Sequence, residues 1–373
     1  MNFGGYVRAK PISDVLLFFA LIVTLSCSQK ETEWKGTIEE KDGVIIVKNP
    51  KEPMYREDIL NLEEDLTIKG ISENQELIFA EVSSIAVDSC EEIFICDSKE
   101  GNIKKFNQNG ELLKIIGKRG QGPGEFGDPG RICISNKNEL VVVDYDRRRL
   151  LFFSNEGDYI GSIPARTMLL LSSTIDSKGN IISHTLRLSQ SNPGYEIIKF
   201  DSNLNPLFII GTMPYHNLRN FNPFMPSYAW AIAKNDNIIY GYSNKYELLV
   251  LDPNGKIIKK IYKEYDPVQV TELEKEEEIK KAPSYTRFDF PEIHSAFQSI
   301  KLDDEGRIYV KTWKEEELKK DYSFDIFDDT GRYIAEVYLK ETPHLFKNNK
   351  LYSVEEDEDG FHVIKRYKVT WNH

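Results

Sequence analysis

The chain has 373 residues, of which 40% are apolar and 12% aromatic, enough to fill a substantial hydrophobic core. Asp and Glu (60) outnumber Lys and Arg (48), so the formal net charge at pH 7 is -12. Nucleic acid attracts proteins through basic side chains, and an acidic chain without a basic block is therefore not expected to bind it.

The N-terminus has the pattern of an export signal. Arg8 and Lys10 precede the apolar run Val15–Leu25, and Ser26 stands before Cys27. A basic segment, an apolar run of about a dozen residues and a small residue at the cut are typical of a secretory signal peptide, and the run is short for a membrane span. We therefore expect residues 1–26 to be a lipoprotein signal peptide and Cys27 to be the lipidation site. A plain secreted protein, in which Cys27 is incidental, is the alternative.

A polar segment follows the expected lipidation site. Residues 27–42 are predicted to be a tether, and the Lys/Glu-rich stretch Ser28–Glu33 suits either a surface-display signal or a simple spacer. The expected location is the outer membrane, with the protein on the cell surface or facing the periplasm. Once Cys27 is lipidated, Cys90, Cys96 and Cys133 remain, an odd number that leaves at least one thiol free or paired between chains.

A turn motif recurs along the rest of the chain. It is first seen as Phe106–Gly110, and its anchor residues are Phe106, Phe153, Phe200, Leu251 and Phe327. The first two steps are 47 residues, the third is 51, and the last is 76 because it contains an insertion. Such a period, with an apolar strand on each side of every turn, predicts four-stranded propeller blades.

The units that contain the motif give the blade count. Five units have four strands each, and a sixth, beginning near His344, has three strands and lacks its outermost one. A closed ring hides the sheet edges that an open array would expose. We therefore predict an all-β, six-bladed propeller over residues 43–373, with four-stranded antiparallel blades. The N-terminal strand Gly43–Lys48 is expected to complete blade six.

The best-formed repeats resemble a known type. Val87-Asp88, Ile95–Asp97, Phe106–Gly110 and Gly120–Phe126 are similar to the NHL-type repeat. Together with the N-terminal signal, residues 35–371 resemble the six-bladed β-propeller lipoproteins of Bacteroidetes-type bacteria. The resemblance implies the fold and implies no particular reaction. The glycine-rich segment Gly117–Phe126 lacks the Lys-Ser/Thr of a phosphate-binding loop, and we interpret it as a tight connection between blades.

Two insertions, residues 212–228 and 263–296, are expected to form a lid on the loop face of the ring. Thr271 followed by Glu274 has the pattern of a helix N-cap, which predicts a short helix up to Lys281. Long loops on a rigid scaffold often carry function. The candidate ligand-binding residues are therefore aromatic and polar side chains of the first insertion and the strand after it: Tyr215, His216, Arg219, Phe221, Phe224 and Trp230. The alternative is that these rings pack the lid onto the blades.

Polar residues near the ends of second strands could meet around the ring axis. The candidate metal ligands, for Ca²⁺ or Zn²⁺, are Asp97, Asp144, His184 and Glu355. The alternative for Asp97 and Asp144 is that their carboxylates accept hydrogen bonds from the N–H groups of their own turns.

The sequence favours a membrane-anchored, non-catalytic binding or scaffold propeller that recognises a glycan, a peptide or an envelope protein through its loop face. It shows no nucleophile with a base and no metal-ligand spacing, so no cofactor is expected. Two alternatives remain: a metal-dependent hydrolase or lyase, lactonase-like, with an axial site, and a purely architectural partner of a membrane transporter. An axial site can be assembled from single residues of several blades, so spacing alone does not decide between them.

Overall fold

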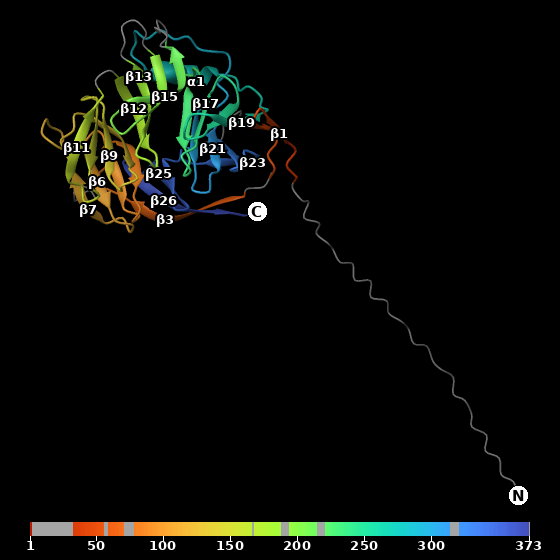
Figure 1. Ribbon diagram of the computed structural model, residues 1–373, viewed down its shortest axis with the longest axis horizontal. Coiled ribbons are helices and arrows are strands. Elements are labelled where there is room, and N and C mark those ends of the chain that lie inside the picture. Colours follow the sequence, from red (N-terminus) through yellow and green to blue (C-terminus); the bar gives the residue numbers. More distant parts are fainter. Residues whose placement is uncertain are drawn as a thin grey trace. The chain divides into compact units, whose positions relative to one another are not determined.

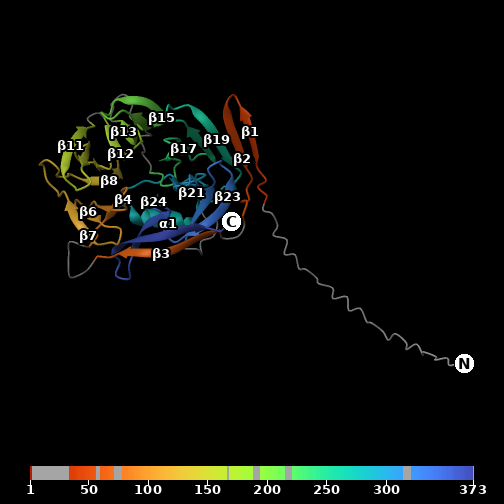
Figure 2. The same cartoon turned by 60° about the horizontal axis from the view of Figure 1, so that its bottom comes forward.

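Six sheets form a ring, and each sheet is one blade of a propeller (Figures 1 and 2). The computed structural model describes residue 1 and residues 33–55, 59–70, 78–165, 168–187, 194–214, 221–313 and 321–372. Cys27 and the expected signal peptide from residue 2 onward lie outside the described residues. Within the described ranges, no helix is both long and apolar enough to cross a membrane.

The predicted all-β, six-bladed propeller is confirmed, and blades one to five each follow the chain from the inner strand to the outer one. The strands of the first three blades are β4 (Val82–Val87), β5 (Ile93–Asp97), β6 (Asn102–Phe106) and β7 (Leu112–Ile116); β8 (Pro129–Ile134), β9 (Leu140–Asp144), β10 (Arg149–Phe153) and β11 (Tyr159–Pro164); and β12 (Met168–Ile175), β13 (Ile181–Arg187), β14 (Gly194–Phe200) and β15 (Pro206–Pro214). Blades four and five contain β16 (Tyr228–Ile232), β17 (Ile238–Tyr242), β18 (Glu247–Leu251) and β19 (Ile257–Lys263), and β20 (Ser299–Leu302), β21 (Ile308–Lys311), β22 (Tyr322–Phe327) and β23 (Tyr333–Leu339).

The recurring turn motif joins the third and fourth strands of these blades, and its side chains show why it recurs. In blade one, the Oδ1 atom of Asn107 accepts hydrogen bonds from the N–H groups of Asn109 and Glu111 at 3.0 and 2.9 Å. Gly110 follows with φ +81°, a conformation that glycine adopts without strain. Asp201, Asp252 and Asp328 make the same pair of bonds in blades three to five. The repeat is therefore a local turn that starts each outer strand.

Blade six joins the two ends of the propeller, but through a different strand from the one predicted. It consists of β24 (Leu345–Lys347), β25 (Lys350–Glu356), β26 (His362–Trp371) and the N-terminal strand β3 (Leu60–Ile68), all antiparallel. Closure by an N-terminal strand is confirmed, whereas its assignment to Gly43–Lys48 is wrong. In β3, Leu60, Leu62, Leu66 and Ile68 are the apolar positions, and a bulge near Asp65 breaks their alternation.

The strand that was expected to close the ring extends blade four instead. β2 (Val44–Asn49) pairs in parallel with the outer strand β19, and β1 (Thr37–Lys41) pairs antiparallel with β2, which makes a six-stranded sheet. β1 lies within the segment expected to be a polar tether. Val47 is fully buried against blades four and five, so β2 is part of the core.

The core lies between neighbouring blades rather than inside any single one. Each cluster of buried apolar side chains combines residues of adjacent sheets; in one, Phe94 of blade one packs with Leu140 and Phe153 of blade two. Cys96 is fully buried in the same cluster, and Cys133 is partly buried in the next. Burial raises the pKa of both thiols to about 12, so neither is a reactive thiolate at neutral pH.

The two local predictions outside the strands are confirmed. The predicted helix is α1 (Glu272–Lys281), and Thr271 and Glu274 form a reciprocal capping box at its start. The glycine-rich segment connects blades one and two. Gly117 has φ +67°, and a Cβ there would lie 2.2 Å from the ring of Phe126, which is fully buried. The glycine therefore allows the turn to cover a core phenylalanine.

Candidate functional site

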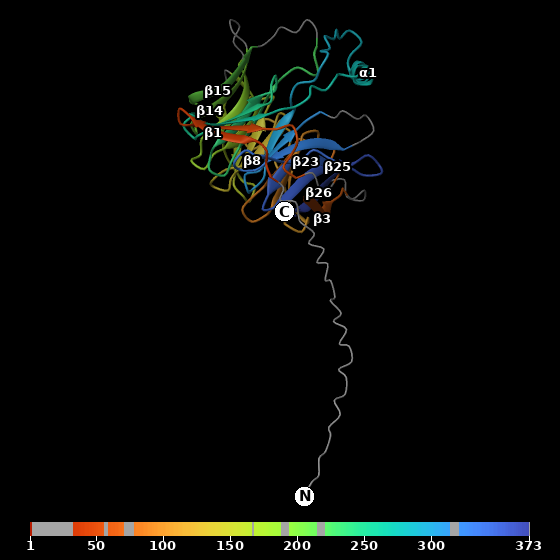
Figure 3. The ribbon, with the colours of Figure 1, turned by 90° about the vertical axis from the view of Figure 1, so that its right-hand side faces the viewer.

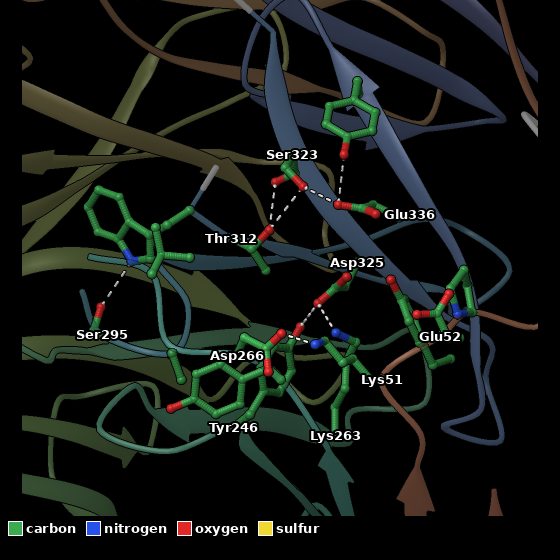
Figure 4. A pocket seen from close by; sticks show the side chains of 17 residues that line it. Lys51, Glu52, Tyr246, Lys263, Asp266, Ser295, Thr312, Ser323, Asp325 and Glu336 are labelled. Atoms are coloured by element: carbon green, nitrogen blue, oxygen red, sulfur yellow. Dashed lines mark hydrogen bonds and ion pairs between the residues drawn. The ribbon is translucent and has the colours of Figure 1, made fainter. Parts of the chain in front are cut away.

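Both insertions lie at the same end of the ring. Because strands alternate in direction, the loop after each second strand and the connection to the next blade share one end, which we call the loop face. α1 projects from this end (Figure 3). A cavity of about 330 Å³ opens between blades four and five (Figure 4). It is lined by Lys51, Glu52, Pro53, Tyr246, Lys263, Tyr265, Asp266, Val268, Ser295, Ala296, Thr312, Trp313, Ser323, Asp325, Tyr333, Glu336 and Tyr338.

A buried carboxylate lies at the base of this cavity. Asp325 of β22 is 3% exposed, and its Oδ2 atom accepts a hydrogen bond from the hydroxyl of Tyr246 at 2.5 Å. The ammonium of Lys263 lies 3.2 Å from the same oxygen and 4.5 Å from the centre of the Tyr333 ring. The cation therefore balances the carboxylate and also contacts an aromatic face.

The two tyrosines at the base remain protonated. Burial raises the pKa of Tyr246 well above its usual value, and the neighbouring carboxylate of Asp325 raises it further. The same two causes, in the same order, raise the pKa of Tyr333. A phenol next to a carboxylate in a desolvated position resists losing its proton, because that would place two negative charges together. At the base of the cavity, the charges of Lys263 and Asp325 therefore cancel, and the neutral phenol of Tyr246 is hydrogen-bonded to Asp325.

Hydroxyl groups and one exposed carboxylate line another wall. Thr312 donates to the hydroxyl of Ser323 at 3.1 Å, and Ser323 donates to Oε1 of Glu336 at 3.1 Å. The hydroxyl of Tyr338 donates to the same oxygen at 3.0 Å. Figure 4 shows this chain of donors ending on Glu336, whose side chain is exposed. The wall offers oriented oxygen atoms to a ligand with hydroxyl or amine donors.

An aromatic wall is fixed by the second insertion. The imidazole of His294 stacks on the indole of Trp313 with ring centres 3.8 Å apart and 14° between the planes. The Nε1 of Trp313 lies 3.4 Å from the hydroxyl of Ser295. His294 Nε2 also lies 3.0 Å from Oε1 of Glu274, the capping residue of α1. Burial lowers the pKa of His294, while Glu274 opposes this shift. The capping glutamate thus ties α1 to the cavity wall.

The segment between β2 and β3 forms part of the rim. Lys51 makes an ion pair with Asp266 across the opening, as seen in Figure 4. The backbone N–H groups of Met54 and Tyr55 donate to the carbonyls of Tyr333 and Ile334 at 3.1 and 2.8 Å, which fixes this segment against blade five. Two of the cations in the lining are therefore already paired: Lys51 with Asp266, and Lys263 with Asp325.

Three of the six ligand residues predicted from the sequence lie within the described residues, and none of these three lines the cavity. Tyr215, His216 and Arg219 lie outside the described residues. Phe221 is 45% exposed and packs against Phe288 of the other insertion, and Phe224 is buried against His294 and Trp313. Trp230 lies in the inner strand β16 and lines a second cavity, which runs along the axis of the ring. The three described residues do not line the cavity, although Phe224 supports its aromatic wall.

Two of the candidate metal ligands, Asp97 and Asp144, each accept hydrogen bonds and form an ion pair within their own blade. Asp97 accepts hydrogen bonds from the N–H groups of Ala80, Glu81 and Glu100 and pairs with Lys104 at 3.0 Å. Of these three donors only Glu100 lies in the turn that follows β5, whereas Ala80 and Glu81 belong to the segment before β4. Asp144 does the same in blade two, with bonds from Gly127, Asp128 and Arg147 and an ion pair with Arg149.

The other two candidate metal ligands, Glu355 of β25 and His184 of β13, lie in different blades. Glu355 accepts from Tyr367 at 2.5 Å and pairs with Lys365 at 3.1 Å. His184 packs near Tyr195, and burial lowers the pKa of its imidazole. Among the described residues, no group of three or more His, Cys, Asp or Glu side chains could hold a metal ion.

The residues that build the cavity were not identified from the sequence. Lys263 ends an outer strand, and Asp325 interrupts the apolar strand Tyr322–Phe327. A charged residue in the interior of a buried strand is a local sign of an ion pair or a functional group. The sequence therefore marks Asp325 as unusual. It does not show the partner, Lys263, which lies about 60 residues earlier in another blade.

The architecture has relatives among known proteins. A family model described as a 6-bladed beta-propeller (DUF5128) matches residues 72–224. A solved structure of a candidate exported protein from Bacteroides fragilis has a TM-score of 0.59 at 13% identity and covers 87% of this chain and 99% of its own. A DUF4221 protein from Bacteroides vulgatus has a TM-score of 0.56 at 12% identity, covering 84% and 99%. At these identities the likeness shows the fold. A search of curated proteins found no match.

Proposed function

We propose that this protein is a non-catalytic binding propeller of the bacterial envelope and that its loop-face cavity, the 330 Å³ cavity between blades four and five, takes a neutral glycan. The observation that supports this proposal is the composition of the lining. Aromatic rings and oriented hydroxyl or carboxylate oxygens share a small cavity whose cations are paired. The flat apolar faces of a sugar ring pack on aromatic side chains, and its hydroxyls pair with such oxygens.

The size and charge of the cavity favour this ligand class. A volume of about 330 Å³ is at the lower end of the range for small-ligand sites. Lys51 and Lys263 are paired with carboxylates, and Glu336 is exposed, so an anionic ligand would meet net negative charge. A neutral polyhydroxylated ligand incurs no such repulsion.

A glycan array followed by calorimetry on the best hit tests this proposal. The variant Glu336→Gln removes the charged acceptor and is expected to weaken binding about tenfold, since a hydrogen bond to a charged group contributes about 1.5–3 kcal/mol. Trp313→Ala is expected to weaken it at least as much, with folding checked by circular dichroism. Glu356→Gln is the matched control, because Glu356 is an exposed glutamate outside the cavity. Unchanged binding in Glu336→Gln, or equal loss in the control, would contradict the assignment.

We further propose that the chain is held at the membrane by a lipid on Cys27. The export pattern before Cys27 supports this proposal. The structurally similar protein from Bacteroides fragilis is described as a candidate exported protein. The variant Cys27→Ala is expected to move the protein from the membrane fraction to the soluble fraction, because the attachment atom is lost. Cys90→Ala, which removes an exposed thiol within the propeller, is the control. Retention of Cys27→Ala in the membrane fraction would refute the anchor.

A further inference from the structure

The inner strands of the propeller surround a second and larger cavity. It has a volume of about 770 Å³ and lies along the ring axis, between strands that Figure 2 shows around the middle of the ring. Its lining comes from all six blades, through the inner strands β4, β8, β12, β16, β20 and β24 and the turns beside them. It shares no lining residue with the loop-face cavity, so the two are separate sites.

The charge of this central channel is opposite to that of the whole chain. The chain carries a net charge of -12, yet four Lys or Arg side chains line the channel against two carboxylates. Both carboxylates already have cationic partners: Asp303 pairs with Arg307 at 3.1 Å, and Asp304 pairs with Lys234 at 3.1 Å. The charge of the remaining cations is therefore not balanced by these two acids.

Arg131 and Lys301 are the two central cations. Arg131 lies on β8 of blade two and Lys301 on β20 of blade five, and blades three apart in a ring of six face each other across the axis. Arg131 is exposed to the channel although its strand neighbours Gly130 and Ile132 are buried. In the part of the chain that the structure describes, neither Arg131 nor Lys301 forms an ion pair.

The environment of Lys301 disfavours its charged form. Its Nζ donates to the carbonyl oxygen of His344 at 3.0 Å. Burial lowers the pKa of Lys301 to about 8, and the positive charge of Arg131 lowers it further. The pKa of His344 is lowered to about 4, mainly by burial and to a smaller extent by the positive charges of Lys301 and Arg131. This imidazole is therefore neutral at pH 7. Like charges facing each other in a partly desolvated channel favour any anion that enters between them.

A third polar residue lies at the wall of the channel. His184 of β13 lines the channel in blade three, next to the blade that carries Arg131. Its Nε2 atom is buried and has no hydrogen-bond partner among the described residues. This atom has almost no accessible surface, so it does not itself face the open channel.

We propose that the central channel binds a small oxyanion, a phosphate or carboxylate group, between the guanidinium of Arg131 and the ammonium of Lys301. The planar guanidinium presents paired N–H donors that match the oxygens of either group, and the ammonium adds a point charge from the opposite side. An anion held there neutralises both cations at once.

Calorimetric titration of the purified protein with inorganic phosphate, and separately with acetate, tests this site at fixed ionic strength. We expect binding of at least one of the two anions. Arg131→Gln and Lys301→Gln are each expected to weaken it about tenfold or more, because a charge-assisted hydrogen bond is lost. Lys137→Gln removes the same charge from an exposed residue outside the channel and is expected to leave binding within about twofold of the parent.

The response to pH gives a second readout. Lys301 loses its proton as the pH rises through about 8, and His344 is already neutral, so affinity is expected to fall between pH 7 and pH 9. The Lys301→Gln variant should lose this dependence. Binding of phosphate alone identifies a phosphate ligand, and binding of acetate alone identifies a carboxylate. Absence of binding by both anions, or full affinity in both channel variants, would overturn the proposal.

The glycan proposal and the anion proposal can be contradicted separately, because the two cavities share no lining residue. Glu336→Gln is expected to leave anion binding unchanged, because Glu336 lines only the loop-face cavity. Loss of glycan binding with retained anion binding would contradict the proposed function alone, and the reverse result would contradict the anion site alone.

Discussion

Single buried polar residues connect neighbouring blades. Asn49, at the end of β2, is 3% exposed, and its side-chain amide donates to the carbonyls of Tyr262 and Gly331 at 3.1 and 2.9 Å. Its carbonyl oxygen accepts from the N–H of Tyr333 at 2.7 Å and from the indole of Trp34 at 3.0 Å. One side chain thus bonds to blade four, blade five and the chain before β1.

Replacing this residue is expected to destabilise the ring. Asn49→Ala leaves four polar groups without their partner, and groups that cannot reach water after the change each cost about 1–3 kcal/mol. We expect the free energy of unfolding to fall by about 3 kcal/mol, measured by urea denaturation. Asn136→Ala, which removes an exposed asparagine with one bond to the carbonyl of Ser177, is the control. Equal losses in the two variants would show that Asn49 does not connect the blades.

At the scale of elements, the sequence predicted what local chemistry determines. The turn between third and fourth strands needs an acceptor side chain and a residue with positive φ, and both are visible at Asn107 and Gly110. The helix α1 was predictable for the same reason, because its capping box lies within four residues. Those signals located the turns, the blades and the helix.

Pairing between distant segments was not predictable in the same way. β2 reads Val-Ile-Ile-Val and looks like the better closing strand, whereas β3 contains Glu63-Glu64-Asp65 at its centre. Two of these three acids pair with basic residues of β26: Asp65 with Arg366 at 2.8 Å, and Glu64 with Lys365 at 3.2 Å. Complementary charge about 300 residues away therefore contributes to the pairing of β3 with β26.

The candidate site was missed for a related reason. The sequence predicts a binding role for aromatic residues of the first insertion, such as Phe221 and Phe224, because they cluster in the sequence. The cavity instead collects Tyr246, Lys263 and Asp325, which meet only when blades four and five are side by side. A sequence pattern shows which residues are unusual, and the register between blades decides which of them share a cavity.

At the scale of the whole molecule, one strand makes the ring continuous. β3 and β26 pair along eight registered positions, from Leu60 opposite Trp371 to Ile68 opposite Ile364. Without β3, the edge of β26 would be open, and exposed edges favour pairing between molecules. β1 and β2 extend blade four outward and are not required for closure.

Two truncations separate closure from extension. A chain that begins at residue 50 lacks β1 and β2 but keeps β3, and it is expected to remain monomeric and to melt cooperatively at a lower temperature, because Val47 and Asn49 are lost. A chain that begins at residue 70 lacks β3 as well. Its uncovered β26 edge is expected to cause association and to remove the single cooperative transition. Circular dichroism melts and light scattering measure both. If the shorter chain is monomeric and melts at the same temperature as the longer one, β3 does not stabilise the ring, and the remaining sheets must hold it through their inter-blade cores alone.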